Sequence, residues 1–353
     1  RTCMRPVSRV ILLSRASKRQ RAYLRHDVTI TRNRKFGTEA RDDHQHCVEF
    51  VQQRDREGYL CGLLMPAHAR DSYFAIRAFN AELASIKDGA FPGEKRRTNE
   101  NDERSSLALR LRMQWWKDAL NQIYENETTS SQAQHPVVKE LHRAVSTHQL
   151  TRRFLERMVN SREIDLDIVQ NESLQELILY SQATQASLLY LSLESAGVRD
   201  EKADNVARHL GTAIGLVSAL RSLTYRASIG EVSLPGDILQ KHEVPRDFIL
   251  SGAMIMPEEQ QDDYFFEHKP KLIGATREIA QVAMSYLRHA RNEQYSVPKP
   301  GRSSLLPVIG SMSYLERLEK HNFDPVHPSV MEDEKQRFSL MMLMARTWLL
   351  GVF

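Results

Sequence analysis

Residues 75–89 read Ala-Ile-Arg-Ala-Phe-Asn-Ala-Glu-Leu-Ala-Ser-Ile-Lys-Asp-Gly, and this stretch indicates the fold class. Its large apolar residues are Ile76, Phe79, Leu83 and Ile86. They are spaced i, i+3, i+7 and i+10, so they line one face of an α-helix. Pro66 and Gly89 are of the residue types that often begin and end helices. The pattern predicts an amphipathic helix from about Pro66 to Gly89.

The same helical periodicity recurs along the chain, for example in residues 177–191 and 206–220. Further helices are expected over residues 107–124, 136–147, 152–168, 258–292, 303–320 and 331–350. Two segments that contain Pro and Gly, residues 90–106 and 227–240, are expected to be loops. No alternating strand pattern is present. The sequence therefore predicts a single all-α domain, a helical bundle over residues 39–353.

The composition is that of a globular protein with a sizeable core, because 41% of the 353 residues are hydrophobic and 27% are charged. The three cysteines form no C-x-x-C pair, so neither a disulfide framework nor a redox motif is expected. His44, His46 and Cys47 crowd together, but structural zinc normally needs four ligands and no second cluster follows. We expect no metal and no cofactor.

Charge is concentrated at the N-terminus. Residues 1–35 contain eleven Lys or Arg and one acid, Asp27, whereas the rest of the chain holds 38 basic and 44 acidic residues. An Arg-rich, acid-poor segment with Ser and Thr is typical of a mitochondrial transit peptide, here residues 1–38 and expected to be disordered; a plain basic tail is the alternative. The mildly acidic remainder gives no indication of a nucleic-acid partner.

The chain has no run of about 20 apolar residues, so no membrane-spanning helix is expected. Residues 338–353 are apolar but are interrupted by Arg346. Such a segment either lies on a membrane surface or packs on the core as a docking helix, and the second interpretation is favoured.

Several stretches, in order, resemble the squalene/phytoene synthase family. They are residues 59–66 and 75–79, then 115–117 with 135–137, then 210–221 with 234–235. The resemblance extends from Tyr59 to Asp324 and implies the isoprenoid synthase-like helical bundle. Working enzymes of that family condense prenyl diphosphates. They use two D-x-x-x-D motifs on facing helices, whose carboxylates hold Mg²⁺ against the diphosphate.

This sequence departs from that pattern at the acidic positions. Alignment of residues 75–79 places the first motif at Ala84 and Asp88, and alignment of the second places it at Ser222 and Arg226. Of the four expected carboxylates only that of Asp88 remains. The positive side chain of Arg226 is expected where a Mg²⁺ ion would bind, and like charges repel. Asn80, one turn before Ala84, could offer an amide oxygen. The sequence therefore indicates a vestigial site without a metal.

Most of the remaining candidate residues have two interpretations. Asp88 precedes a glycine and suits a helix-end turn better than catalysis. Arg221 and Arg226 either grip an anionic ligand without metal or are salt-bridged, and the second is favoured. Gly215, four residues after Gly211, permits close helix packing or leaves room for a ligand.

Two further clusters have structural interpretations. The acidic cluster at residues 162–167 is interpreted as a solvated helix end. Trp115 and Trp116 are expected to anchor the core.

Residues 77–83, 188–191 and 322–328 are similar to a mitochondrial branch of the family rather than to its working enzymes. That resemblance implies a non-catalytic matrix protein, peripheral to the inner membrane, that supports early assembly of respiratory complex I through biogenesis of a membrane core subunit. Its partners would be complex I subunits or assembly intermediates, with an isoprenoid or lipid as a further ligand. Two alternatives stay open: a prenyl-diphosphate transferase with altered metal use, and a metal-free prenyl-lipid carrier. The vestigial site comprises Asn80, Ala84, Asp88, Gly215, Arg221, Ser222 and Arg226.

Overall fold

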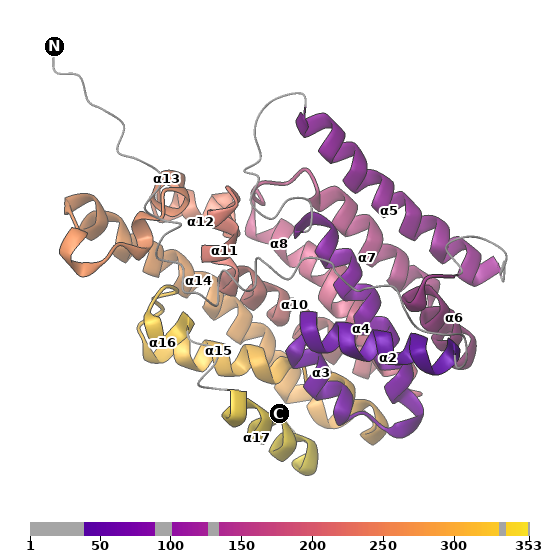
Figure 1. The fold of residues 1–353 in the computed structure, drawn as a ribbon. Coiled ribbons are helices and arrows are strands. Elements are labelled where there is room, and N and C mark those ends of the chain that lie inside the picture. Colours follow the sequence, from indigo (N-terminus) through magenta and orange to yellow (C-terminus); the bar gives the residue numbers. More distant parts are fainter. Residues whose placement is uncertain (1–38, 89–100, 126–133, 332–336, 352–353) are drawn as a thin grey trace. The chain divides into compact units, whose positions relative to one another are not determined.

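A computed structural model describes residues 39–88, 101–125, 134–331 and 337–351 (Figure 1). The transit peptide predicted for residues 1–38 lies outside these ranges, and the domain limits stay a prediction. Within the described ranges every regular element is a helix, which confirms the all-α fold class.

The first half contains α2 (Glu39–Arg54), α3 (Arg56–Leu63), α4 (Ala67–Asp88), α5 (Asn101–Glu125), α6 (Pro136–His148), α7 (Arg152–Asp165), α8 (Leu174–Ser181), the π-helical segment η2 (Gln182–Ala186) and α9 (Ser187–Ser195). The second half contains α10 (Glu201–Arg221), α11 (Leu223–Ser228), α12 (Gly236–Lys241), α13 (Arg246–Leu250), α14 (Asp263–Glu293), α15 (Val308–Lys320), α16 (Pro328–Met331) and α17 (Arg337–Leu350). Short 3₁₀ segments are η3 (Ala253–Ile255), η4 (Glu258–Gln260), η5 (Gln294–Ser296) and η6 (Lys299–Leu305).

The helix predicted from residues 75–89 is confirmed as α4, whereas several other boundaries were wrong; for example, the helix expected over 303–320 begins at Val308. Helix α5 already begins at Asn101, so residues 101–106 are not a loop; acidic residues of the kind found there stabilise a first helical turn. The helix expected over 258–292 begins only at Asp263, because the Asp262 side chain accepts a hydrogen bond from the Phe265 amide at 2.9 Å and caps it. The loop expected over 227–240 is shorter, lying between α11 and α12.

The core is organised around α10, which packs most extensively against α14 and also contacts α8, η2, α9 and α15 (Figure 1). Val206 and Leu210 from its first half belong to one buried cluster, together with side chains of α4, α6, α7 and α9. Leu216 and Leu220 from its second half belong to another, together with side chains of α14 and α15. This one helix therefore joins both apolar clusters of the bundle.

Helices α8 and α9 form one continuous rod with the wider π turn η2 in its middle, and α10 crosses it there. A Cβ atom at Gly211 would collide with the backbone of Ala186, and one at Gly215 would collide with Ser181. The glycine pair therefore serves close packing, as the first of its two interpretations predicted.

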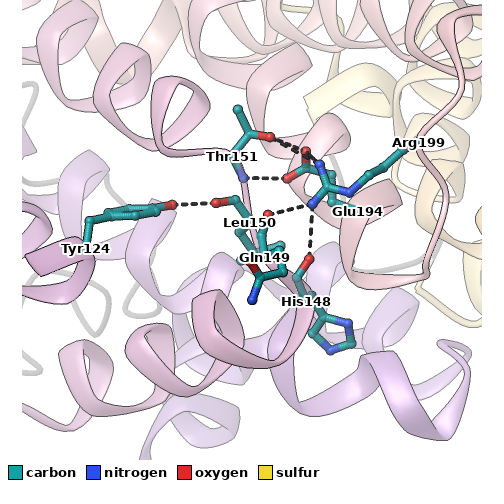
Figure 2. Close-up of polar contacts among 7 residues, drawn as sticks. All are labelled: Tyr124, His148, Gln149, Leu150, Thr151, Glu194 and Arg199. Atoms are coloured by element: carbon teal, nitrogen blue, oxygen red, sulfur yellow. Dashed lines mark hydrogen bonds and ion pairs between the residues drawn. The ribbon is translucent and has the colours of Figure 1, made fainter. Parts of the chain in front are cut away.

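A buried carboxylate fixes the connection between α6 and α7 (Figure 2). Glu194, at the end of α9, accepts hydrogen bonds from the amide and hydroxyl of Thr151, which precedes α7. It also pairs with Arg199, whose Nη2 donates to the carbonyls of His148 and Gln149 at 3.1 and 2.6 Å. An anion thus sits at the start of α7 and a cation at the end of α6, which complements both helix dipoles.

The C-terminal helix α17 packs on α15, burying Met344 and Thr347, so the docking interpretation is confirmed. Part of its remaining surface is apolar: Met341, Met342, Trp348, Leu349 and Leu350 are exposed, as is the basic Arg346. None of the described helices combines the length and apolar character needed to cross a bilayer.

Candidate functional site

The candidate site is built on one face of α4. Asn80, Ala84 and Lys87 are separated by four and three residues, so they share that face. The face meets α7, which packs against α4. Ala84 is exposed and Asn80 is half-buried. Asp88 is the last residue of α4, and its side chain lies outside the described part of the structure.

Lys87 is the centre of a charge network that the sequence interpretation missed. Its side chain is 12% exposed, and its ammonium donates to Asp165 Oδ2 at 3.2 Å and to the Ile168 carbonyl at 2.9 Å. Glu231 Oε1 lies 3.5 Å from the same ammonium. A lysine from α4 thus joins the end of α7 to the turn that follows α11.

Arg226 completes this network. Its Nη1 donates to Glu231 Oε2 at 2.9 Å, and the Glu231 amide donates to the Arg226 carbonyl at 2.9 Å. The turn between these two residues passes through Gly230, whose φ of 86° lies in the left-handed region that favours glycine. Asp165, Lys87, Glu231 and Arg226 therefore alternate in sign.

The network is self-neutralising. Burial raises the pKa of Asp165, and Lys87 is the main opposing influence. The carboxylates of Asp165 and Glu231, only 19% and 10% exposed, are directed at a lysine and an arginine. Both carboxylates are therefore neutralised by basic side chains of the protein. A Mg²⁺ site instead requires carboxylate oxygens that are available to the metal ion.

Arg221 and Ser222 also contact groups outside this network. Arg221 pairs with Glu57 of α3 at 2.9 Å and lies over the Tyr314 ring. The Ser222 hydroxyl donates to the Ala219 carbonyl at the end of α10. Arg221 and Arg226 are both salt-bridged, as the favoured interpretation stated.

Residues 162–167 are not a solvated helix end, and that interpretation was wrong. Glu163 pairs with Lys117 at 2.6 Å, Asp165 with Lys87, and Asp167 with Arg110 at 2.6 Å. The bases come from α4 and α5, which are distant in sequence from α7. Trp116, on the same α5, is buried, and Trp115 packs against the same core cluster, as predicted.

Arg162 is the other residue that the sequence interpretation missed. It is 6% exposed, and its Nη2 donates to Asn80 Oδ1 at 2.6 Å while its Nη1 is 3.4 Å from the Met158 carbonyl. Burial lowers the pKa of this guanidinium, and Tyr180 and Asp165 oppose the effect. A buried cation thus lies one turn from Asp165 on α7.

The crowded His44, His46 and Cys47 do not form a common site. His44 faces Asp71 at 3.6 Å, His46 stacks on Phe50, and burial raises the pKa of the Cys47 thiol. Across the described residues, no group of three or more His, Cys, Asp or Glu side chains could hold a metal ion.

Comparisons with known proteins agree on one family. The squalene/phytoene synthase model matches residues 51–342. Complex I assembly factor 6 of NADH dehydrogenase (ubiquinone) from Bos taurus is 36% identical over 295 residues, which cover 83% of this chain and 79% of that protein. The Mus musculus protein of the same name is 37% identical over 82% of this chain and 78% of its own length. A crystal structure of a dehydrosqualene synthase in complex with ligand superposes with a TM-score of 0.65 at 15% identity, covering 89% of this chain and 99% of that one.

Proposed function

Since this chain belongs to the squalene/phytoene synthase family, and proteins named as complex I assembly factors are 36% and 37% identical to it over about four-fifths of both chains, we propose that it assists the assembly of mitochondrial respiratory complex I without catalysing prenyl transfer. The observation that carries the proposal is the identity of 36% over four-fifths of both chains with a complex I assembly factor. The step it would support is an early one, the biogenesis of a membrane core subunit.

The charge network supports the non-catalytic part of the proposal. A Mg²⁺ ion near Asp165 or Glu231 would have to displace Lys87 and Arg226 from these carboxylates. Two like unit charges 4 Å apart repel by about 4 kcal/mol at an effective dielectric constant near 20, and a dication doubles that cost. Ser222, at the other second-motif position, supplies no carboxylate in compensation.

The catalytic alternative has a direct test. Purified protein would be incubated with farnesyl diphosphate and Mg²⁺, and released diphosphate would be measured. We expect no release above that of a heat-treated sample. Turnover that depends on Mg²⁺ and is lost in Asp88→Ala would overturn the non-catalytic proposal.

The proposed location is the matrix side of the inner membrane. The basic leader supports import, and α17 supports peripheral attachment, because residues 337–350 contain two arginines, no acid and an exposed apolar surface. A helix with an apolar surface and only basic charges can lie at the boundary between lipid headgroups and acyl chains.

The assembly role is tested in mitochondria that lack the protein. Complex I abundance would be measured on native gels and rescued with wild type or with Asp88→Ala, which removes the last acid of the vestigial motifs. We expect complex I to fall and both versions to restore it. Unchanged complex I without the protein would contradict the assembly role, and rescue by wild type alone would assign a task to the vestigial motif.

A further inference from the structure

Arg162 is a buried cation whose hydrogen-bond acceptors are neutral. Among the described residues these acceptors are the Asn80 amide oxygen and the Met158 carbonyl. A guanidinium has five N–H donors, and these two neutral acceptors each take one N–H, from Nη1 and from Nη2. A buried charge without a counter-ion costs stability, and proteins normally pair it.

The nearest acids are already engaged elsewhere. Asp165, one turn along α7, is held by Lys87, and Glu163 is held by Lys117. The side chain of α8 that acts most on Arg162 is Tyr180, which is a phenol rather than a carboxylate. The described structure therefore supplies no anion that is committed to this guanidinium.

The side chain of Asn80 is oriented so that its amide group offers a further hydrogen-bond donor. Its oxygen accepts from Arg162, so its amide nitrogen is directed elsewhere, and it has no acceptor among the described residues. The amide nitrogen of Asn80 and the guanidinium of Arg162 are both hydrogen-bond donors. Ala84, one turn along the same face of α4, is exposed, and Asn80 is half-buried. Solvent exposure therefore decreases from Ala84 through Asn80 to the buried Arg162.

We propose that Arg162, with Asn80 beside it, binds the phosphate group of a ligand at the contact of α4 with α7, without a metal ion. A planar guanidinium fork matches phosphate oxygens, which accept hydrogen bonds and supply the missing negative charge. The phosphate is either free or the headgroup of a lipid. This site is distinct from Arg221 and Arg226, whose guanidinium groups are engaged by Glu57 and Glu231.

The test is isothermal titration calorimetry of the full chain in EDTA, with inorganic phosphate and with dioctanoyl phosphatidic acid as probes. We expect both to bind wild type and Arg162→Met to bind at least about tenfold more weakly, because a charge-assisted hydrogen-bond pair is lost. The matched control is Arg110→Met, which removes an exposed arginine from the neighbouring α5 and should leave both affinities unchanged. Tighter binding of the lipid than of phosphate would identify a lipid headgroup as the source, and equal binding would identify a free phosphate.

Melting temperatures separate a binding role from a structural one. If Arg162 is kept for a ligand, Arg162→Met removes an uncompensated buried charge and should melt at or above the temperature of wild type when no phosphate is present. If the residue is only a structural link to Asn80, the variant should melt lower and wild type should bind neither probe. That result would overturn the proposal, as would equal affinity in wild type and Arg162→Met.

A conservative variant covers a failure of Arg162→Met to fold. Arg162→Lys keeps the charge but lacks the fork, so it should bind phosphate more weakly than wild type. Affinity equal to wild type would refute the role of the guanidinium. Neither result bears on complex I abundance in the native-gel experiment, so the two proposals can fail separately.

Discussion

Replacing Glu194 by Gln tests how the first half of the bundle is held together. The side chain of Glu194 is 7% exposed. It accepts hydrogen bonds from the amide and hydroxyl of Thr151 and from the guanidinium of Arg199 (Figure 2). Glutamine has nearly the same shape but only one oxygen. It would keep one of these bonds and turn an NH₂ group toward the other donors.

The magnitude follows from the partners that are lost. A hydrogen bond to a charged group contributes about 1.5–3 kcal/mol. The Arg199 pair contributes less than its geometry suggests, because that side chain is 49% exposed and water screens it. We therefore expect Glu194→Gln to lower the free energy of unfolding by about 2–3 kcal/mol, and Arg199→Gln by about 1 kcal/mol.

The assay is urea denaturation followed by far-ultraviolet circular dichroism. The midpoint should fall in the order wild type, Arg199→Gln, Glu194→Gln, with an unchanged dependence on urea. A loss below about 0.5 kcal/mol for Glu194→Gln would refute the reasoning, since surface substitutions commonly reach that size. The reverse order would show that the carbonyls of His148 and Gln149, bonded by Arg199, matter more than the start of α7.

Three further outcomes follow from single contacts. Gly215→Ala should destabilise the protein by about 1–3 kcal/mol in urea denaturation, because the added methyl group meets a buried α8 side chain; unchanged stability would show that the crossing can widen. Lys87→Met should lower stability near neutral pH, where Asp165 loses its counter-charge. Burial already raises the pKa of this carboxyl, so the deficit should shrink as pH falls and the acid is protonated; a deficit independent of pH would contradict the pairing. Leu349→Ser should weaken sedimentation with anionic vesicles, whereas Tyr295→Ser, which changes an exposed aromatic residue outside α17, should not; equal loss in both would refute an α17 contact.

The helices were predictable where a long apolar face sets them. Ile76, Phe79, Leu83 and Ile86 are all buried, and α4 has the limits that Pro66 and Gly89 predicted. Predictions of helix boundaries were wrong where a single polar side chain determines the start of the helix. The cap at Asp262 and the polar first turn of α5 resemble loop composition, because the same residue types favour turns and helix starts.

The contacts of the candidate site could not be predicted from the sequence. The alignment that places the second motif at Ser222 and Arg226 stays a prediction, and no local pattern connects Arg226 with Lys87, which precedes it by more than 130 residues. Arg162 was also invisible, since an arginine among acids usually indicates solvated charge. Partners of this kind depend on helix packing, which periodicity does not specify.

The charge network explains how an enzyme-like scaffold can remain folded without a metal. Asp165 and Glu231 are carboxylates in a mostly buried place, and they would repel each other if they had no cation between them. In a metal-dependent synthase, bound ions can supply such positive charge. Here the side chains of Lys87 and Arg226 supply the positive charge, so no bound ion is needed to balance the carboxylates of Asp165 and Glu231. Removing Arg226 would take one counter-charge from Glu231, and an acid at this position would add a third negative group. The present arrangement is therefore separated from a metal site by several simultaneous substitutions.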